Sequence, residues 1–225
     1  MNDLAVAYML ANRPDEASKL LEEASMSAPP DVFHACQTAL LQVWFGMDAQ
    51  YAATRQRMLK WAANTDKLVE ASFAARLACP SPIPNAAMQE AALTLAQRAV
   101  SLMRTDPWVF PHQLVLGMAE YRSGHYPAAE QAFLAAEKGA KENPDGPCAP
   151  AVQSAAGFYR AMILLQKGKT PEAARLFTRT ESAMKPLPAN EKNPFADGTS
   201  YDDMILWLAF KEAKALLNET AAIKP

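Results

Sequence analysis

Cysteine is scarce in this 225-residue sequence, and its three cysteines, Cys36, Cys79 and Cys148, lie far apart. An odd number of widely spaced cysteines argues against a disulfide framework and against a zinc site, and it favours reduced thiols in the cytoplasm. No apolar run reaches the roughly 18 residues that a membrane span needs, and the acidic N-terminus does not resemble a signal peptide. We therefore expect a cytoplasmic chain without a membrane segment.

Strong charge of one sign is lacking as well. The chain has 22 Lys and Arg residues against 24 Asp and Glu residues, and it has no run of basic residues. This balance gives no drive toward nucleic acid or an anionic membrane. There is also no Walker loop, no His-Glu-x-x-His, no Gly-x-Ser-x-Gly, and none of the protein-kinase catalytic motifs. The sequence therefore predicts no catalytic residue, no cofactor and no metal site.

The histidines give no further sign of chemistry. His34 and Cys36 are two residues apart on a predicted helix, so they point to different faces and do not suit one metal ion. His125 stands in a predicted turn on the solvent side, where neither a cleft nor an orienting partner is indicated.

Helix-forming residues dominate what is present, and alternating β-branched runs are nearly absent. Pro, Gly and Asn punctuate the chain at the spacing of one helix and a turn. Asn85 is placed to cap one helix, and Ser200 with Asp203 resembles a capping box at the start of another. This pattern predicts about eleven helices, near 3–11, 14–27, 30–45, 48–63, 66–78, 86–104, 107–123, 126–141, 150–167, 171–184 and 201–219.

Three segments align on their turns as internal repeats. They are "LAVAYMLANRPDEASKLLEEASMSAPP", "LGMAEYRSGHYPAAEQAFLAA" and "MILLQKGKTPEAARLF". Gly124 and Gly168 can end a helix in the left-handed conformation without a Cβ penalty. Small residues such as Gly117 and Ala129 let the two helices of a pair approach closely. Because such a pair cannot bury its apolar faces alone, it must stack on its neighbours.

These segments resemble the tetratricopeptide repeat, a helix-pair unit of about 34 residues. The second segment matches nearly the whole repeat pattern, with Gln113 where the first helix usually has Trp. The resemblance implies an all-α, right-handed superhelix of helix pairs within one domain. We expect units at about 1–29, 30–64, 66–105, 110–143 and 150–184, and a capping helix at about 201–219. Because the first unit begins part-way through its first helix, the chain is interpreted as a fragment of a longer protein. The alternative is that Met1 is a natural start and that the first helix pair is simply short.

The order of the units adds a second resemblance. A helix that starts at Tyr51 and carries Met58-Leu59 is followed by "RLACPSP", by "LAQRAV" and then by the best repeat. This order is similar to the C-terminal repeat region of large serine/threonine protein kinases of planctomycete-type and verrucomicrobial bacteria. Those kinases carry their catalytic domain upstream, so the resemblance implies that this segment is itself non-catalytic.

The predicted function is therefore a protein-interaction scaffold that binds a peptide or a helix in an apolar concave groove. In stacked helix pairs the first helices line that groove, and flexible Met side chains suit variable apolar partners. The candidate partner-binding residues are Val6, Met9, Leu114, Met118, Tyr121, Arg122, Phe158, Tyr159, Met162 and Leu165.

Several alternatives remain open at this point. The candidate residues can instead pack against neighbouring helices or against the proline-containing segment 185–200. Trp207, Phe210, Leu206 and Leu217 are expected to cap the open end of the array, which leaves Asp202, Asp203, Lys211, Glu212 and Lys214 facing water. The alternative functions are a stand-alone tetratricopeptide adaptor or chaperone, and an all-α enzyme. The enzyme alternative requires several titratable side chains to converge in the groove.

Overall fold

The computed structural model describes residues 30–103, 109–195 and 198–222, together with Tyr8, Arg13, Glu16, Ala17, Lys19, Leu20 and Glu23. The predicted helices near 3–11 and 14–27 lie largely outside the described residues. The candidate residues Val6 and Met9 lie outside them entirely.

Over these ranges the chain is all-α, with nine helices and no strand. The helices are α3 (Val32–Trp44), α4 (Asp48–Ala62), α5 (Leu68–Ala78), α6 (Ala86–Leu102), α7 (Phe110–Arg122), α8 (Tyr126–Glu142), α9 (Ala149–Gln166), α10 (Thr170–Glu181) and α11 (Tyr201–Ala222). Each helix predicted from residue 30 onward corresponds to one of them, with ends that differ by at most three residues.

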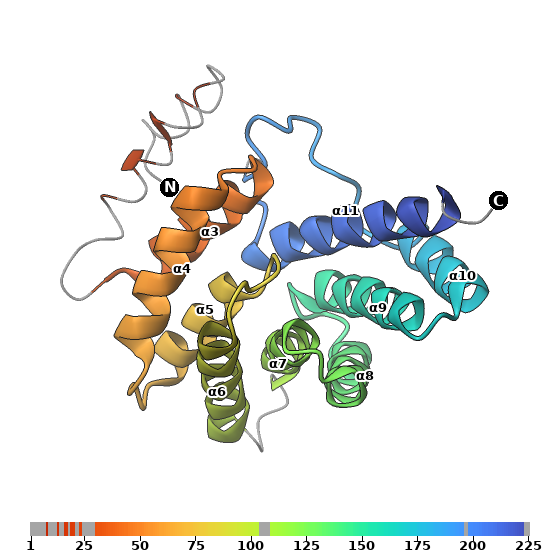
Figure 1. The fold of residues 1–225 in the computed structure, drawn as a ribbon, viewed down its shortest axis with the longest axis horizontal. Helices are drawn as coiled ribbons and strands as arrows, with labels where there is room; N and C mark the ends of the chain where they lie inside the picture. The colour runs from red at the N-terminus through yellow and green to blue at the C-terminus, as the bar shows by residue number, and fades with distance from the viewer. Residues whose placement is uncertain are drawn as a thin grey trace.

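The helices α3 to α10 form four consecutive antiparallel pairs arranged in an arc (Figure 1). Each odd-numbered helix contacts the next odd-numbered helix, from α3 through α5 and α7 to α9, and α4 contacts α6. The first helices of the pairs therefore stack on one another as one layer. This arrangement buries a continuous core that no single pair could provide.

Three of the four pairs are joined by the same tight turn. Gly46, Gly124 and Gly168 have φ values of 69°, 76° and 70°, the left-handed region that only glycine adopts without strain. The residue after each glycine donates its backbone N–H to the carbonyl five residues earlier: Met47 to Gln42, His125 to Glu120 and Lys169 to Leu164, at 2.8, 2.9 and 2.9 Å. The predicted left-handed helix ends at Gly124 and Gly168 are confirmed, and Gly46 adds a third.

Small residues set the distance between the helices of a pair. A Cβ atom on Gly117 of α7 would lie 2.5 Å from the Phe133 ring of α8. The helices can therefore pack this closely only because position 117 carries no side chain. This is the close approach that the sequence predicted.

The last helix, α11, lies outside the paired arrangement. It crosses the open side of the arc and contacts α3, α9 and α10 (Figure 1). Its start is the predicted capping box, because Ser200 Oγ accepts the Asp203 N–H at 3.1 Å and Asp203 Oδ2 accepts the Ser200 N–H at 2.9 Å. The prediction that α11 only caps the end of the array was incomplete, since α11 reaches from the first described pair to the last.

Candidate functional site

The candidate site is the surface formed by α3, α5, α7 and α9, which we call the inner face. Leu114 and Met118 of α7 and Phe158 and Met162 of α9 are fully buried there. Tyr121 and Tyr159 are buried, Leu165 is partly buried, and the Arg122 side chain is only 3% exposed. The candidate residues that the structure describes are therefore packed against neighbouring helices and do not line an open groove.

The helix α11 covers much of this face with aromatic side chains. The Phe210 ring of α11 lies 5.5 Å from Phe158 of α9 and 5.7 Å from Phe177 of α10. Trp207, which is 1% exposed, lies 6.2 Å from Trp44 of α3. Each buried aromatic ring of this size removes a large apolar area from water. The apolar side of α11 therefore contributes the main attractive contact with the inner face.

Two buried ion pairs hold α11 at separate points along its length. Arg76 of α5 pairs with Asp202, and Arg122 of α7 donates from Nη1 and Nη2 to the two carboxylate oxygens of Glu212, both at 2.6 Å. The two acidic residues are ten positions apart, which is about 15 Å along a helix. The bidentate geometry fixes the orientation of α11 as well as its position.

These pairs correct the sequence interpretation of the charges on α11. Asp202, Asp203 and Glu212 were expected to face water, but each forms an ion pair. Asp202 pairs with Arg76, Glu212 with Arg122, and Asp203 with Lys185 at 2.8 Å. Asp202 and Glu212 lie on one stripe of the helix with Leu206 and Ala209. The sequence signal for these ion pairs was the presence of two acidic residues within an otherwise apolar stripe of the helix.

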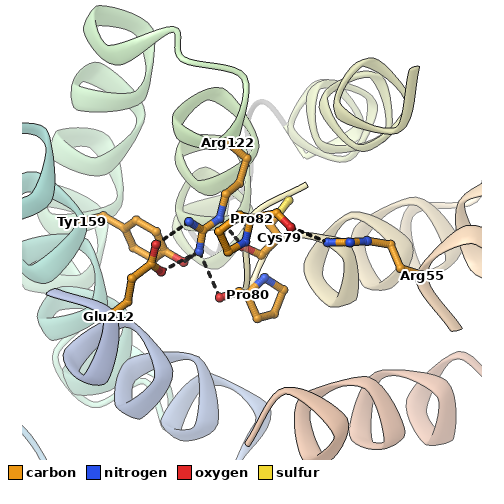
Figure 2. A network of polar contacts seen from close by, with 7 residues as sticks. All are labelled: Arg55, Cys79, Pro80, Pro82, Arg122, Tyr159 and Glu212. Atoms are coloured by element: carbon orange, nitrogen blue, oxygen red, sulfur yellow. Dashed lines mark hydrogen bonds and ion pairs between the residues drawn. The ribbon is translucent and has the colours of Figure 1, made fainter. Parts of the chain in front are cut away.

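Arg122 also satisfies the backbone of the connection between α5 and α6 (Figure 2). Its Nε donates to the carbonyl of Cys79 at 2.9 Å, and its Nη2 donates to that of Pro80 at 3.0 Å. Arg55 of α4 donates to the Pro82 carbonyl at 3.0 Å. Prolines supply no N–H in this connection, so the side chains of α4 and α7 take over the role of the missing backbone donors.

Burial fixes the protonation states in this network. It raises the pKa of the Cys79 thiol and of the Tyr121 hydroxyl, each to about 12. It also raises the pKa of Tyr159, whose hydroxyl lies 3.4 Å from Arg122 Nη2. Burial alone would lower the pKa of Arg122, but Tyr159 and Glu212 outweigh it and the pKa is raised. With these shifts, the four groups keep their protons at neutral pH and act here as partners in contacts between helices.

The convergence of these titratable side chains was not predicted from the sequence, and the enzyme alternative required such a convergence. The groups here are paired: both oxygens of Glu212 accept hydrogen bonds from Arg122. Elsewhere, His34 Nδ1 lies 2.8 Å from Asp31 at the protein surface, and Nδ1 of the exposed His125 lies 2.8 Å from the buried carboxylate of Glu120. In the described ranges, no three His, Cys, Asp or Glu side chains gather where they could hold a metal ion.

Comparisons with known proteins add no further identification. No family model, no curated protein and no solved structure matches the chain. Among the helices that the structure describes, none combines the length and the apolar character required to cross a membrane.

Proposed function

We propose that this chain is a non-catalytic protein-interaction scaffold of tetratricopeptide type whose inner face receives an amphipathic helix. In this proposal α11 is the resident occupant of the face, and a helix of a partner protein competes with it. The scaffold is a right-handed superhelix of helix pairs. The identical turns at Gly46, Gly124 and Gly168 and the stacked layer of first helices support this assignment.

The observation that carries the proposal is the way in which α11 is bound. It packs on the first helices α3 and α9 and on α10, and its ion pairs reach Arg76 of α5 and Arg122 of α7. Its contacts combine an aromatic centre with an arginine–carboxylate pair toward each end of the contact region. This combination is typical of a helix docked in a groove, where apolar anchors give affinity and charged groups fix register.

The contacts that α11 makes with the inner face also define the chemistry of the partner helix. The partner helix carries two acidic residues ten positions apart, which meet Arg76 and Arg122. Aromatic and aliphatic residues lie between them, as Leu206, Trp207 and Phe210 do in α11. The 19 residues between α10 and α11 contain no helix among those described. Trp44 and Trp207 donate to the carbonyls of Glu191 and Lys185 in this connection, so the connection detaches together with α11 when the helix leaves the face.

The second resemblance supports a proposal about the protein of which this scaffold is part. We propose that it is the C-terminal repeat portion of a bacterial serine/threonine protein kinase, where it positions partners or substrates for a catalytic domain upstream. The alternative is a stand-alone adaptor or chaperone. The sequence of the complete gene distinguishes the two, because only the first requires a kinase domain encoded before Met1.

A peptide competition experiment tests the proposal. A fluorescent peptide of residues 201–222 is titrated into the wild-type chain and into the Asp202→Asn, Glu212→Gln double variant. In the wild type, α11 competes at an effective concentration that reaches the millimolar range for tethered ligands. The variant weakens only the tethered helix, so we expect the peptide to bind it at least about tenfold more tightly, which corresponds to about 1.4 kcal/mol.

The controls distinguish specific docking of the peptide on the inner face from nonspecific binding. A peptide with both acidic residues replaced by lysine should not bind, because it places like charges against Arg76 and Arg122. Far-UV circular dichroism checks that the variant stays folded, and the two single variants are measured in parallel. The proposal is wrong if the folded variants bind the wild-type peptide no better than the wild-type chain does, or if the lysine peptide binds equally well.

A further inference from the structure

A second polar region lies between α8, α9 and α10, where a hollow of about 330 Å³ opens to solvent. Residues of all three helices line it, among them Lys141, Ser154, Gly157, Leu176, Arg179 and Thr180. A volume of this order is at the lower end of the range for small-ligand pockets.

The hollow is shaped by close packing of α9 and α10. A Cβ atom on Gly157 would lie 2.7 Å from Thr180 Oγ1, so a side chain at position 157 would have to displace the side chain of Thr180. Thr180 in turn donates its hydroxyl hydrogen to the Leu176 carbonyl at 2.9 Å. The floor of the hollow is therefore closely packed, and Leu176 and Gly157 make part of it apolar.

One hydroxyl group that lines the hollow has no partner within the described residues. Ser154 is only 6% exposed and lines the hollow, and its hydroxyl makes no hydrogen bond within the described residues. The Ser154 oxygen is not sealed from solvent, and it faces the hollow. The hydroxyl of Ser154 is thus a hydrogen-bond donor available to a ligand.

Two cations at the hollow are also uncompensated. Lys141 and Arg179 are exposed and form no ion pair with any described carboxylate. The carboxylate of Glu137, which also lines the hollow, already accepts from Arg160 Nη1 with both oxygens at 2.9 Å. The charge of Glu137 is therefore offset, and the hollow presents two positive charges beside a free hydroxyl.

We propose that this hollow binds a phosphate monoester. Two cations match the charge of a phosphate monoester, which is about −1.5 to −2 at neutral pH. The guanidinium of Arg179 suits its oxygens in a bidentate manner, Ser154 donates a further hydrogen bond, and the apolar floor receives the organic part of the ester. The site is separate from the inner face and does not depend on the function proposed for α11.

The test is a nuclear magnetic resonance titration of the full, ¹⁵N-labelled chain with O-phosphoserine, with serine and with inorganic phosphate. We expect O-phosphoserine to cause saturable shifts of amides near residues 153–157 and 179–183. Serine should cause none, and inorganic phosphate should bind more weakly because it lacks an organic part. The absence of saturable shifts with O-phosphoserine, or equal binding of inorganic phosphate, overturns the proposal.

The chain offers a matched pair of arginines for the control. Arg175 lies one turn before Arg179 on α10, is likewise exposed and without an ion pair, but does not line the hollow. We expect Arg179→Gln to weaken O-phosphoserine binding about tenfold and Ser154→Ala about threefold, whereas Arg175→Gln changes it less than about twofold. Equal losses of O-phosphoserine affinity in the two arginine variants would show that only the overall positive charge matters, and they would overturn the proposal.

Discussion

The helix pairs of this protein are joined in two different ways. The turns at Gly46, Gly124 and Gly168 satisfy their own backbone groups within a few residues. The connection between α5 and α6, "CPSPIPN", accepts hydrogen bonds from Arg55 of α4 and Arg122 of α7, and Tyr51 of α4 donates to the carbonyls of Leu77 and Ala78 just before it. A local turn needs only a glycine, whereas a proline-containing connection draws its hydrogen-bond donors from distant helices.

The difference has a consequence for α11. Because Arg122 serves both the carbonyls of Cys79 and Pro80 and the carboxylate of Glu212, the α5–α6 connection and the docking of α11 share one side chain (Figure 2). The local turns have no such link to α11. A substitution that disrupts the α5–α6 connection should therefore also weaken the docking of α11 and lower stability strongly. A substitution in a glycine turn should lower stability only slightly.

The largest effect is expected for Arg122→Leu. This change leaves Glu212 and two carbonyl oxygens without their donor, and breaking a buried pair in this way costs about 3–5 kcal/mol. Urea unfolding followed by circular dichroism measures the loss. The matched control is Lys167→Leu, which removes the more exposed pair with Glu130 and should cost less than about 1 kcal/mol. Similar losses in the two variants would show that Arg122 has no special role.

An intermediate effect is expected from the Cys79 thiol at alkaline pH. Burial raises its pKa from 9.0 to about 12, so the folded state keeps the proton at pH values where the unfolded state releases it. This contribution to stability is complete below pH 9 and is lost as the pH rises from 9 to 12. Each pH unit within that window costs about 1 kcal/mol.

The Cys79→Ala variant isolates this thiol from the other titrating groups. The difference in unfolding free energy between the wild type and the variant should shift by about 2 kcal/mol between pH 9 and pH 11, in favour of the variant. Urea titrations at both pH values measure it. A difference that does not change with pH would mean that the thiol is not shielded from water.

The smallest effect is expected at the local turns. Gly124→Ala and Gly168→Ala should each cost about 1–2 kcal/mol, because an L side chain is strained at these positive φ values. No atom lies within 4 Å of the added Cβ at either site, so the cost is conformational alone and should be nearly equal in the two variants. Thermal unfolding measures it, and unequal losses would show that the two turns are not equivalent.

The parts of the fold that were predictable from the sequence are the local ones. The glycine turns, the cap at Asn85 and the capping box of Ser200 with Asp203 each depend on residues within a few positions of one another. The position of α11 on the inner face was not predicted, because it depends on the pair of Arg122 and Glu212, which are 90 residues apart. Their pairing depends on how far the arc of helix pairs curves, which no local pattern records.

The inner face also shows what could not be predicted from the sequence. The spacing of Met118, Tyr121 and Phe158 identified one continuous apolar surface, and the structure places these side chains together in the core. The apolar pattern alone could not tell an open groove from one already filled. The filled state depends on α11, which joins the arc only after a long connection.

Hydrogen exchange of the full chain tests most directly whether α11 is a separable occupant of the inner face. If it is, the amides of residues 201–222 should exchange together through an opening that costs less free energy than global unfolding, while α7 and α8 stay protected. An excess of the 201–222 peptide should leave α7 and α9 protected while α11 is released. Exchange of α11 only at the rate of α7 and α8, with or without the peptide, would contradict the account and make α11 a fixed part of the core.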